Sequence, residues 1–347
     1  MRYPEFIRDG GTIGFVAPSF GSASEPYESA FKSALREFTR RGYKAVLGPN
    51  CFASDGIGIS SSSKSCAKEL TDFYTSTEND ILISCGGGEL MCGILPFVDF
   101  DAIGKAPAKW FMGYSDNTNF TFLLTTICDI ASIYGPCAAT FGMNPWHESI
   151  TDAYQLLKGE TTTVHGYELW EKEELKSPEN PFAPYNVSEH RELRYFVDGE
   201  LLPAASVKMS GRLLGGCMDC LVNLLGTTFD HVSEFNERYK EDGIIWFLEA
   251  CDLNVMSIRR AIWQMEHAGW FQYTKGFLIG RPYFQGQEMM GLDQYHAVCD
   301  ILAEYNVPII MDVDLGHLPP MMPLICGSLA EVTSEDNKIT IQMREEE

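Results

Sequence analysis

The sequence has 347 residues, of which 45% are hydrophobic and 21% charged, a composition typical of a globular protein long enough for two domains. Its formal net charge is −22 and no stripe of basic residues offsets it, which argues against nucleic acid as a partner. No apolar run approaches the roughly 20 residues that a membrane-spanning helix needs, so we expect no membrane partner either.

The N-terminus and the cysteines indicate a reducing compartment. Pro4, Glu5 and Asp9 interrupt the stretch where a secretory signal would need basic and then unbroken apolar residues. Eleven cysteines, an odd number, are scattered through apolar segments, as is typical of reduced and buried thiols. These features predict a cytoplasmic protein.

Residues 1–158 are predicted to form an N-terminal α/β domain with a parallel sheet. Short apolar runs alternate with helical segments near residues 25–41 and 62–75. The runs lack polar alternation, as buried parallel strands do. We expect strands in "TIGFVA", "KAVLG", "ILISC" and "KWFMG".

The segment "ILISCGGGELMCG" places Gly86, Gly87 and Gly88 directly after a buried strand. A backbone without side chains can approach a ligand and present amide donors, although an ordinary tight turn explains the glycines equally well. Met91 occupies the third glycine position of a dinucleotide-binding fingerprint, and the Gly-Lys-Ser/Thr of a P-loop is absent. The sequence therefore predicts no cofactor.

Ser115 lies between the strand "KWFMG" and the helical segment "NTNFTFLLTTI". Such a turn exposes the serine hydroxyl as a nucleophile, and the helix start and the Asp116 N–H favour negative charge beside it. The alternative is that Ser115 only caps the helix, a role that serine fills often. Asn117 stands where the Gly-x-Ser-x-Gly motif of α/β-hydrolases requires its second glycine, so the pattern is not theirs.

Residues 159–208 lose all periodicity and carry Pro178, Pro181, Pro184 and many charges. We expect an irregular insertion or linker, a type of segment that often forms part of a binding site. Trp170 lies within it and could line such a site.

Residues 209–347 are predicted to form a C-terminal domain, with a strand at residues 244–248 and a helix at residues 255–268. Cys217-x-x-Cys220 resembles a redox motif, but thiols at this spacing more often serve packing. No second Cys-x-x-Cys accompanies it, and Asp312 and Asp314 are only weak cation ligands. We therefore predict no metal site.

Glu249 and His317 each follow an apolar run in this domain, "IIWFL" and "PIIMDVDLG". A carboxylate so close to a buried strand is costly unless it is paired, and a histidine would satisfy it. Alternatively, Glu249 caps the following helix or pairs with Arg259 or Arg260. The order of serine, acid and base along a chain is free, because a catalytic triad is defined by its geometry.

The motifs "CGGGE", "MGYSDNT", "GRLLGGCMDCL", "FLEACD" and "DLGHLPPMMPLICG" together resemble the LD-carboxypeptidase family of serine peptidases, over nearly the whole chain. The resemblance implies an α/β class, with a parallel-sheet N-terminal domain and a smaller β-rich C-terminal domain. It also implies a catalytic triad of Ser115, Glu249 and His317, and an oxyanion hole formed by the amides of Gly88 and Asp116.

The length and the insertion resemble the microcin C immunity-like branch of this family. The resemblance implies hydrolysis of an amide in a peptide-like or aminoacyl-nucleotide-like small molecule, with Gly87 and Trp170 at the substrate and Trp170 stacking on the base. It also implies a homodimer. Two alternatives stay open: a murein tetrapeptide LD-carboxypeptidase that releases terminal D-alanine, and a protein that binds a small ligand without catalysis.

Overall fold

The computed structural model describes residues 1–344, and its contacts divide the chain into two compact units. The first unit contains residues 1–161, 173–186 and 323–325. The second contains residues 162–172, 187–322 and 326–344. Within the described residues, no helix combines the length and the apolar character that crossing a bilayer requires.

The first unit is built on a six-stranded sheet with the order β15-β5-β4-β3-β1-β2. Neighbouring strands from β5 to β2 run parallel. Their apolar residues face helices on both sides, which explains why the strands read as unbroken hydrophobic runs. The strands are β1 (Thr12–Val16), β2 (Lys44–Leu47), β3 (Ile81–Ser84), β4 (Phe111–Gly113), β5 (Ser132–Tyr134) and β15 (Leu324–Cys326).

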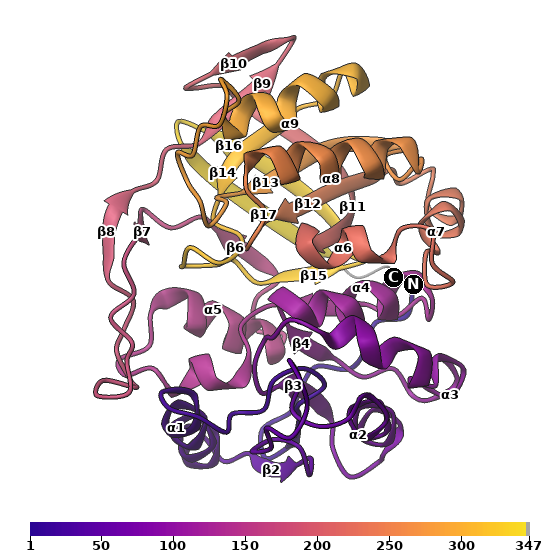
Figure 1. Cartoon of the computed structure of the whole chain (residues 1–347), viewed down its shortest axis with the longest axis vertical. Coiled ribbons are helices and arrows are strands. Elements are labelled where there is room, and N and C mark those ends of the chain that lie inside the picture. Colours follow the sequence, from indigo (N-terminus) through magenta and orange to yellow (C-terminus); the bar gives the residue numbers. More distant parts are fainter. Residues whose placement is uncertain (345–347) are drawn as a thin grey trace. The chain divides into compact units, whose positions relative to one another are not determined.

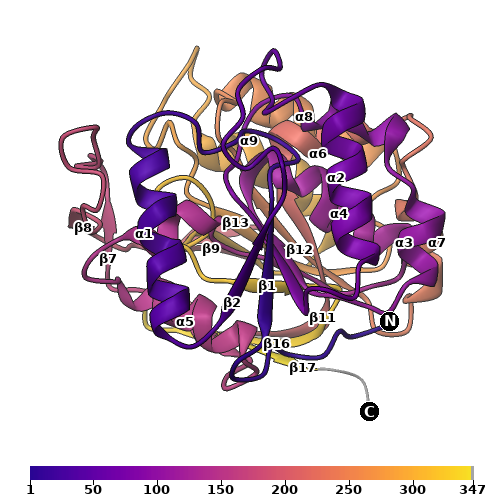
Figure 2. The same cartoon turned by 90° about the horizontal axis from the view of Figure 1, so that it is seen from below.

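Helices cover both faces of this sheet, with α1 and α5 on one side and α2, α3 and α4 on the other (Figure 2). On the second side, Val16 and Leu82 of the strands pack in one core with Tyr74 of α2 and Phe120 of α4. The helices are α1 (Tyr27–Arg40), α2 (Ser63–Thr75), α3 (Phe100–Lys105), α4 (Thr118–Thr126) and α5 (Glu148–Leu157). The helices predicted near residues 25–41 and 62–75 thus correspond to α1 and α2.

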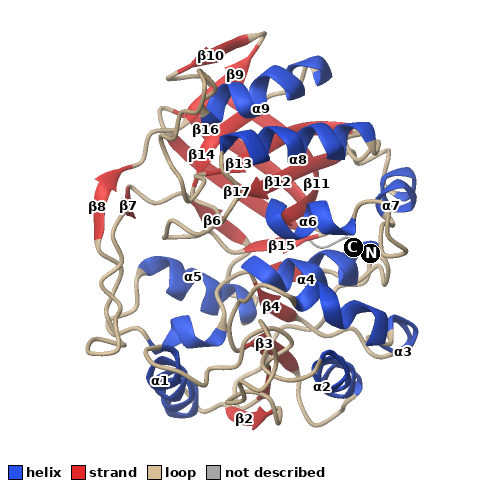
Figure 3. Cartoon of the chain, viewed as in Figure 1, coloured by secondary structure: helices blue, strands red, loops and turns tan. Residues whose placement is uncertain are grey.

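The second unit contains a nine-stranded sheet with the order β10-β9-β14-β13-β12-β11-β16-β17-β6. Its central strands β11 to β14 run parallel and its outer strands pair antiparallel (Figure 3). The predicted α/β class with a β-rich C-terminal region is confirmed. The strands are β6 (Thr163–His165), β9 (Arg194–Val197), β10 (Glu200–Leu202), β11 (Val207–Cys217), β12 (Ile244–Glu249), β13 (Thr274–Gly280), β14 (Ile309–Val313), β16 (Leu329–Glu335) and β17 (Lys338–Arg344).

Helices α6, α8 and α9 lie over one face of this sheet (Figure 1). The buried side of α8 includes Val255, Ile258, Ile262 and Met265, so the three-to-four-residue spacing in the sequence marks a core face. The helices of this unit are α6 (Met218–Leu224), α7 (Val232–Arg238), α8 (Val255–His267) and α9 (Gln294–Leu302).

Residues 159–208 are more ordered than the sequence predicts. They contain β6, β9, β10 and the two-stranded sheet of β7 (Leu169–Glu171) and β8 (Val187–His190). Residues 173–186, which carry the three prolines, contribute to the first unit, whereas the flanking residues belong to the second. Strands of three or four residues are too short to show a sequence period, which is why the segment reads as irregular.

Candidate active site

Ser115 lies in a sharp turn between β4 and α4. Strand β4 is fully buried and ends at Gly113, and a short 3₁₀ turn of residues 115–117 leads into the helix. The backbone φ of Ser115 is 58°, in the left-handed region that non-glycine residues rarely adopt. A serine held in this conformation between a strand and a helix is the geometry of a nucleophile elbow. Asn117, rather than Ser115, occupies the N-cap of α4.

Hydrogen bonds from its neighbours hold this turn. The N–H of Ser115 donates to the hydroxyl of Tyr134 at 3.2 Å, and the hydroxyl of Thr118 donates to the Ser115 carbonyl at 2.5 Å. The amide of Asn117 donates to the carbonyls of Tyr114 at 3.1 Å and Gly86 at 2.9 Å. Asn117, which departs from the α/β-hydrolase motif, therefore ties the serine turn to the glycine loop.

Asp116 is a buried carboxylate that organises the same turn. It accepts hydrogen bonds from the Ser19 hydroxyl, from the Met91 N–H at 2.8 Å and from the Asn119 amide at 3.0 Å. A buried carboxylate is tolerable when it is hydrogen-bonded in this way. These contacts fix the Asp116 side chain within the turn.

The glycine loop passes directly beside Ser115. A Cβ added to Gly87 would lie 3.4 Å from Ser115 Oγ, and one added to Gly88 would lie 2.0 Å from Ser19 Oγ. The Gly87 carbonyl accepts from the Phe20 N–H at 2.9 Å. Since a trans peptide directs its carbonyl and its N–H to opposite sides, this bond turns the Gly88 N–H away from Phe20.

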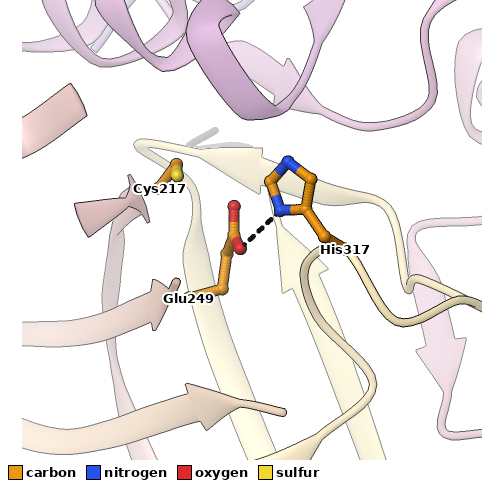
Figure 4. Close-up of side chains that lie close together, drawn as sticks. All are labelled: Cys217, Glu249 and His317. Carbon is orange, nitrogen blue, oxygen red and sulfur yellow. Dashed lines mark hydrogen bonds and ion pairs between the residues drawn. The ribbon is translucent and has the colours of Figure 1, made fainter. Parts of the chain in front are cut away.

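In the second unit, Glu249 and His317 form a hydrogen-bonded pair. Glu249 is the last residue of β12 and is 1% exposed, and His317 lies in the loop that follows β14. His317 Nδ1 lies 2.9 Å from Glu249 Oε2, and because a carboxylate only accepts, the ring nitrogen is the donor (Figure 4). The arginines that offered an alternative partner are occupied elsewhere: Arg259 pairs with Asp300, and Arg260 donates to Ser257.

The protonation of His317 is controlled by two opposing effects. Burial disfavours the charged imidazolium, but the negative charge of Glu249 outweighs it, together with a contact to the Cys251 thiol. The pKa of His317 consequently lies well above its ordinary value of 6.5. The pair is thus suited to accept and hold a proton.

Two glycines make room for this pair. Gly316 has a φ of 102°, and a Cβ at this position would lie 2.6 Å from Glu249 Oε2. A Cβ at Gly280 would lie 2.3 Å from the Leu315 carbonyl and 3.0 Å from Glu249 Cβ. A larger residue at either position would therefore crowd the Glu249 side chain.

Arg281 is a residue that the sequence analysis missed. It is 1% exposed and donates to the carbonyl of Asp312 at 3.1 Å and to that of Leu318 at 3.4 Å, on either side of His317. Its guanidinium also pairs with Asp314 at 2.7 Å, and Arg191 pairs with the other oxygen of that carboxylate at 3.0 Å. These ion pairs, which we call the Arg281 clamp, fix the loop that carries His317.

Trp170, in β7, packs on this clamp. It is 8% exposed, its indole N–H donates to the His190 carbonyl at 3.2 Å, and the Arg281 guanidinium lies 5.2 Å from its ring centre. These contacts give Trp170 a structural function, and its stacking on a nucleobase stays a prediction.

Cys217 lies next to the acid. It ends β11, and the parallel register of β11 and β12 pairs it with Glu249. Its thiol donates to Asp219 at 3.4 Å, and contact with Cys220, burial and nearby acidic groups raise its pKa well above the ordinary value. Among residues 1–344, one set of His, Cys, Asp and Glu side chains is grouped closely enough to hold a metal ion, and it consists of Cys217, Glu249 and His317.

Two parts of the chain match models of known protein families. Residues 13–135 match the model of the LD-carboxypeptidase N-terminal domain, and residues 210–332 match that of the LD-carboxypeptidase C-terminal domain. The chain belongs to the LD-carboxypeptidase family. This membership assigns it to the hydrolases, as a relative of serine peptidases.

Two curated relatives span nearly the whole chain. The microcin C7 self-immunity protein MccF of Escherichia coli is 23% identical over 96% of this chain and 93% of its own length. A Bacillus subtilis protein named "Probable murein peptide carboxypeptidase" is 25% identical over 98% of this chain and 94% of its own length. The solved structure of MccF in complex with glutamyl sulfamoyl guanosine has a TM-score of 0.79 at 21% identity, covering 99% of this chain and 98% of that one. This member of the LD-carboxypeptidase family therefore shares the MccF fold.

Proposed function

We propose that this protein is a serine amidase in which Ser115 is the nucleophile and His317 the general base. The observation that carries the proposal is the pair of buried Glu249 and partly buried His317, joined at 2.9 Å and flanked by two glycines at which an added Cβ would crowd Glu249. A carboxylate that orients a histidine and raises its proton affinity is the partner that a serine nucleophile needs. The left-handed serine turn of the first unit supplies that nucleophile.

The reaction proceeds in two halves. Ser115 Oγ attacks the amide carbonyl carbon while His317 Nε2 takes the hydroxyl proton, and Glu249 holds the Nδ1–H and stabilises the imidazolium. His317 then returns the proton to the leaving nitrogen, and the carbon–nitrogen bond breaks to leave an acyl-enzyme. A water molecule, deprotonated by the same histidine, releases the acid and restores the serine.

The amides of Gly88 and Asp116 are the proposed donors to the oxyanion. The Gly87 carbonyl is held by Phe20, which directs the Gly88 N–H to the opposite side of the peptide. Asp116 follows the nucleophile directly, the position from which a nucleophile elbow supplies an amide donor. Removing one such donor typically costs 100- to 1,000-fold in turnover, on the order of 3–4 kcal/mol.

The proposed substrate is an amino acid joined through an amide-like bond to a nucleotide-like group. Support comes from the MccF fold, solved in complex with glutamyl sulfamoyl guanosine, and from the match to MccF over nearly the whole chain. Gly87, beside Ser115 Oγ, leaves space for the acyl group. The second candidate is a murein tetrapeptide, favoured by the similarly distant Bacillus subtilis relative. We retain the homodimer as a prediction.

The test is a mass-spectrometric hydrolysis assay on two substrates, an aminoacyl sulfamoyl adenosine and a murein LD-tetrapeptide. Wild type is compared with Ser115→Ala and with Ser210→Ala, a control that removes an exposed serine hydroxyl. We expect the Ser115 variant to lose on the order of a millionfold in turnover and the control to match wild type. Cleavage by wild type of the adenosine conjugate alone supports the first substrate, and release of D-alanine alone supports the second. Activity retained by Ser115→Ala would refute the mechanism.

A further inference from the structure

Cys217 has no role in the proposed hydrolysis, yet with Glu249 and His317 it forms a possible metal-ligand set. One ligand atom from each, the thiol sulfur, a carboxylate oxygen and a ring nitrogen, all lie within 4.8 Å of one another. The Glu249 carboxylate lies between Cys217 and the His317 ring (Figure 4). All three residues belong to the second unit, so the set is complete within one part of the fold.

The backbone holds these residues in place. Cys217 and Glu249 end adjacent parallel strands in register, and each is 1% exposed. His317 is fixed by the Glu249 contact and by the Arg281 clamp on its loop. A metal ion bound here would therefore meet ligands that are already ordered, which lowers the cost of binding.

The donor set is that of zinc. Thiolate, imidazole and carboxylate are the three zinc ligands in proteins, whereas calcium and magnesium prefer sites made of oxygen. In a tetrahedral zinc site, ligand atoms lie roughly 3.3–3.6 Å apart, so atoms within 4.8 Å close on the ion after shifts on the order of 1 Å. Three protein ligands leave a fourth position for water.

We propose that Cys217, Glu249 and His317 bind a zinc-class divalent cation, and that the bound ion inhibits the enzyme. When the ion binds the Cys217 sulfur and His317 Nδ1, the thiol proton passes to solvent. The proton on Nδ1 moves to Nε2 if the ring is neutral, and passes to solvent if the ring is an imidazolium, so the bound ring carries one proton, on Nε2. An imidazole metallated at one nitrogen and protonated at the other has no lone pair to accept the Ser115 proton. The inhibition rests on the proposed serine mechanism, whereas the binding does not.

The binding is tested on metal-free full-length protein with Zn²⁺ in competition with a chromophoric chelator, and with Co²⁺ as a spectroscopic probe. Cys217→Ser removes the soft ligand, and Cys220→Ser, which alters the next cysteine of the chain, in α6, is the matched control. We expect one equivalent of Zn²⁺ and a thiolate-to-cobalt absorption band in wild type and Cys220→Ser. In Cys217→Ser we expect loss of the band and at least about a tenfold weaker affinity. Equal binding by the two variants would overturn the site.

Inhibition is tested on the same proteins in the hydrolysis assay, with each rate normalised to that protein's own zinc-free rate. We expect Zn²⁺ to inhibit wild type and Cys220→Ser, EDTA to reverse it, and Cys217→Ser to need at least about tenfold more Zn²⁺. Zinc that binds through Cys217 but leaves hydrolysis unchanged, or accelerates it, would overturn the inhibition. If zinc binds but no substrate is cleaved even without metal, the site stands and the proposed function fails.

Discussion

The Glu249 carboxylate sets the pH range in which His317 can act as a base. A general base works in its neutral form, and the pKa of His317 lies well above 6.5 because the charge of Glu249 outweighs the effect of burial. We therefore expect the acid limb of kcat/KM, measured with EDTA present, to lie above pH 6.5. Glu249→Gln removes the charge and leaves the burial, so the limb should move to lower pH.

The same substitution should also lower turnover, on the order of 10,000-fold, because the amide no longer enforces the Nδ1–H tautomer. The measurement is a pH profile of kcat/KM for both proteins. An unchanged limb in Glu249→Gln would contradict the assignment of that pKa to His317.

Gly316 lies against Glu249, where an added side chain would crowd the carboxylate. In Gly316→Ala, the new Cβ would lie 2.6 Å from Glu249 Oε2, at a φ of 102°. We expect a loss of about 1–3 kcal/mol in the free energy of unfolding and a fall in kcat. Gly286→Ala is the matched control, because Gly286 also has a positive φ, of 78°, but no atom lies within 4 Å of its added Cβ.

Both variants are compared by urea unfolding and by steady-state kinetics. The control reports backbone strain alone, so we expect it to lose stability but to keep its turnover. A kcat in Gly316→Ala equal to that of the control would show that crowding of Glu249 does not affect the chemistry.

One buried lysine, Lys109, connects the chain just before strand β4, which leads to Ser115, with the C-terminal end of helix α2. Lys109 Nζ donates to the carbonyls of Phe73 at 3.1 Å and Ser76 at 2.6 Å and to Asn79 Oδ1 at 2.7 Å. Lys109→Met would leave these acceptors without their donor, and we expect a cost of about 2 kcal/mol in unfolding free energy. Lys105→Met, at an exposed position, is the control and should be nearly neutral.

The contribution of Lys109 to the free energy of unfolding should also depend on pH. Burial lowers the pKa of Lys109 to about 8 from 10.5, so between these values the unfolded chain holds a proton that the folded protein has released. The contribution of Lys109 to stability therefore rises from pH 8 towards 10.5. We expect the difference between wild type and Lys109→Met to widen over that range, and a constant difference would contradict this.

Two kinds of element could be predicted from the sequence: strands that are continuous apolar runs, and helices with apolar residues along one face. The buried runs that became β1, β3 and β12 are unbroken, and α8 places its apolar residues on one face. The short strands between residues 159 and 208 could not be predicted, because three or four residues show no period. The edge strand β15 was missed because its partner β5 is remote in sequence.

In the candidate site, too, some features could be predicted from the sequence and others could not. Ser115, Glu249 and His317 stand at the ends of apolar runs, and this position singled them out. Cys217 and Glu249 are neighbours because of the register between β11 and β12. The sequence pattern of either strand alone does not specify that register. The Arg281 clamp depends likewise on contacts across three loops, so a buried arginine after "KGFLIG" carried no visible signal.

For the whole molecule, the first unit takes residues from three separate parts of the chain. We therefore expect residues 1–161 not to fold stably without the other two parts. Residues 1–161 lack β15, the edge partner of β5, and the segment in which the Phe182 carbonyl accepts from the Asn144 N–H at 3.0 Å. An unpaired strand edge promotes association with other chains. We expect a fragment of residues 1–161 to self-associate in size-exclusion chromatography and to unfold at a lower temperature than the full chain.

The control is the full chain cut after residue 161, with both pieces expressed together, since this keeps every strand available. We expect the two pieces to co-purify and to restore the thermal transition. A fragment of residues 1–161 that is monomeric and unfolds at the temperature of the full chain would refute this account.

The late position of β15 also has a consequence for biosynthesis. Strands β1 to β5 leave the ribosome early, whereas β15 is near the end of the chain and follows them by roughly 10 to 40 s at usual rates of translation. During that interval the nascent sheet that carries Ser115 has a bare edge at β5. We therefore expect interrupted translation to release an incomplete sheet that associates with other chains through this edge.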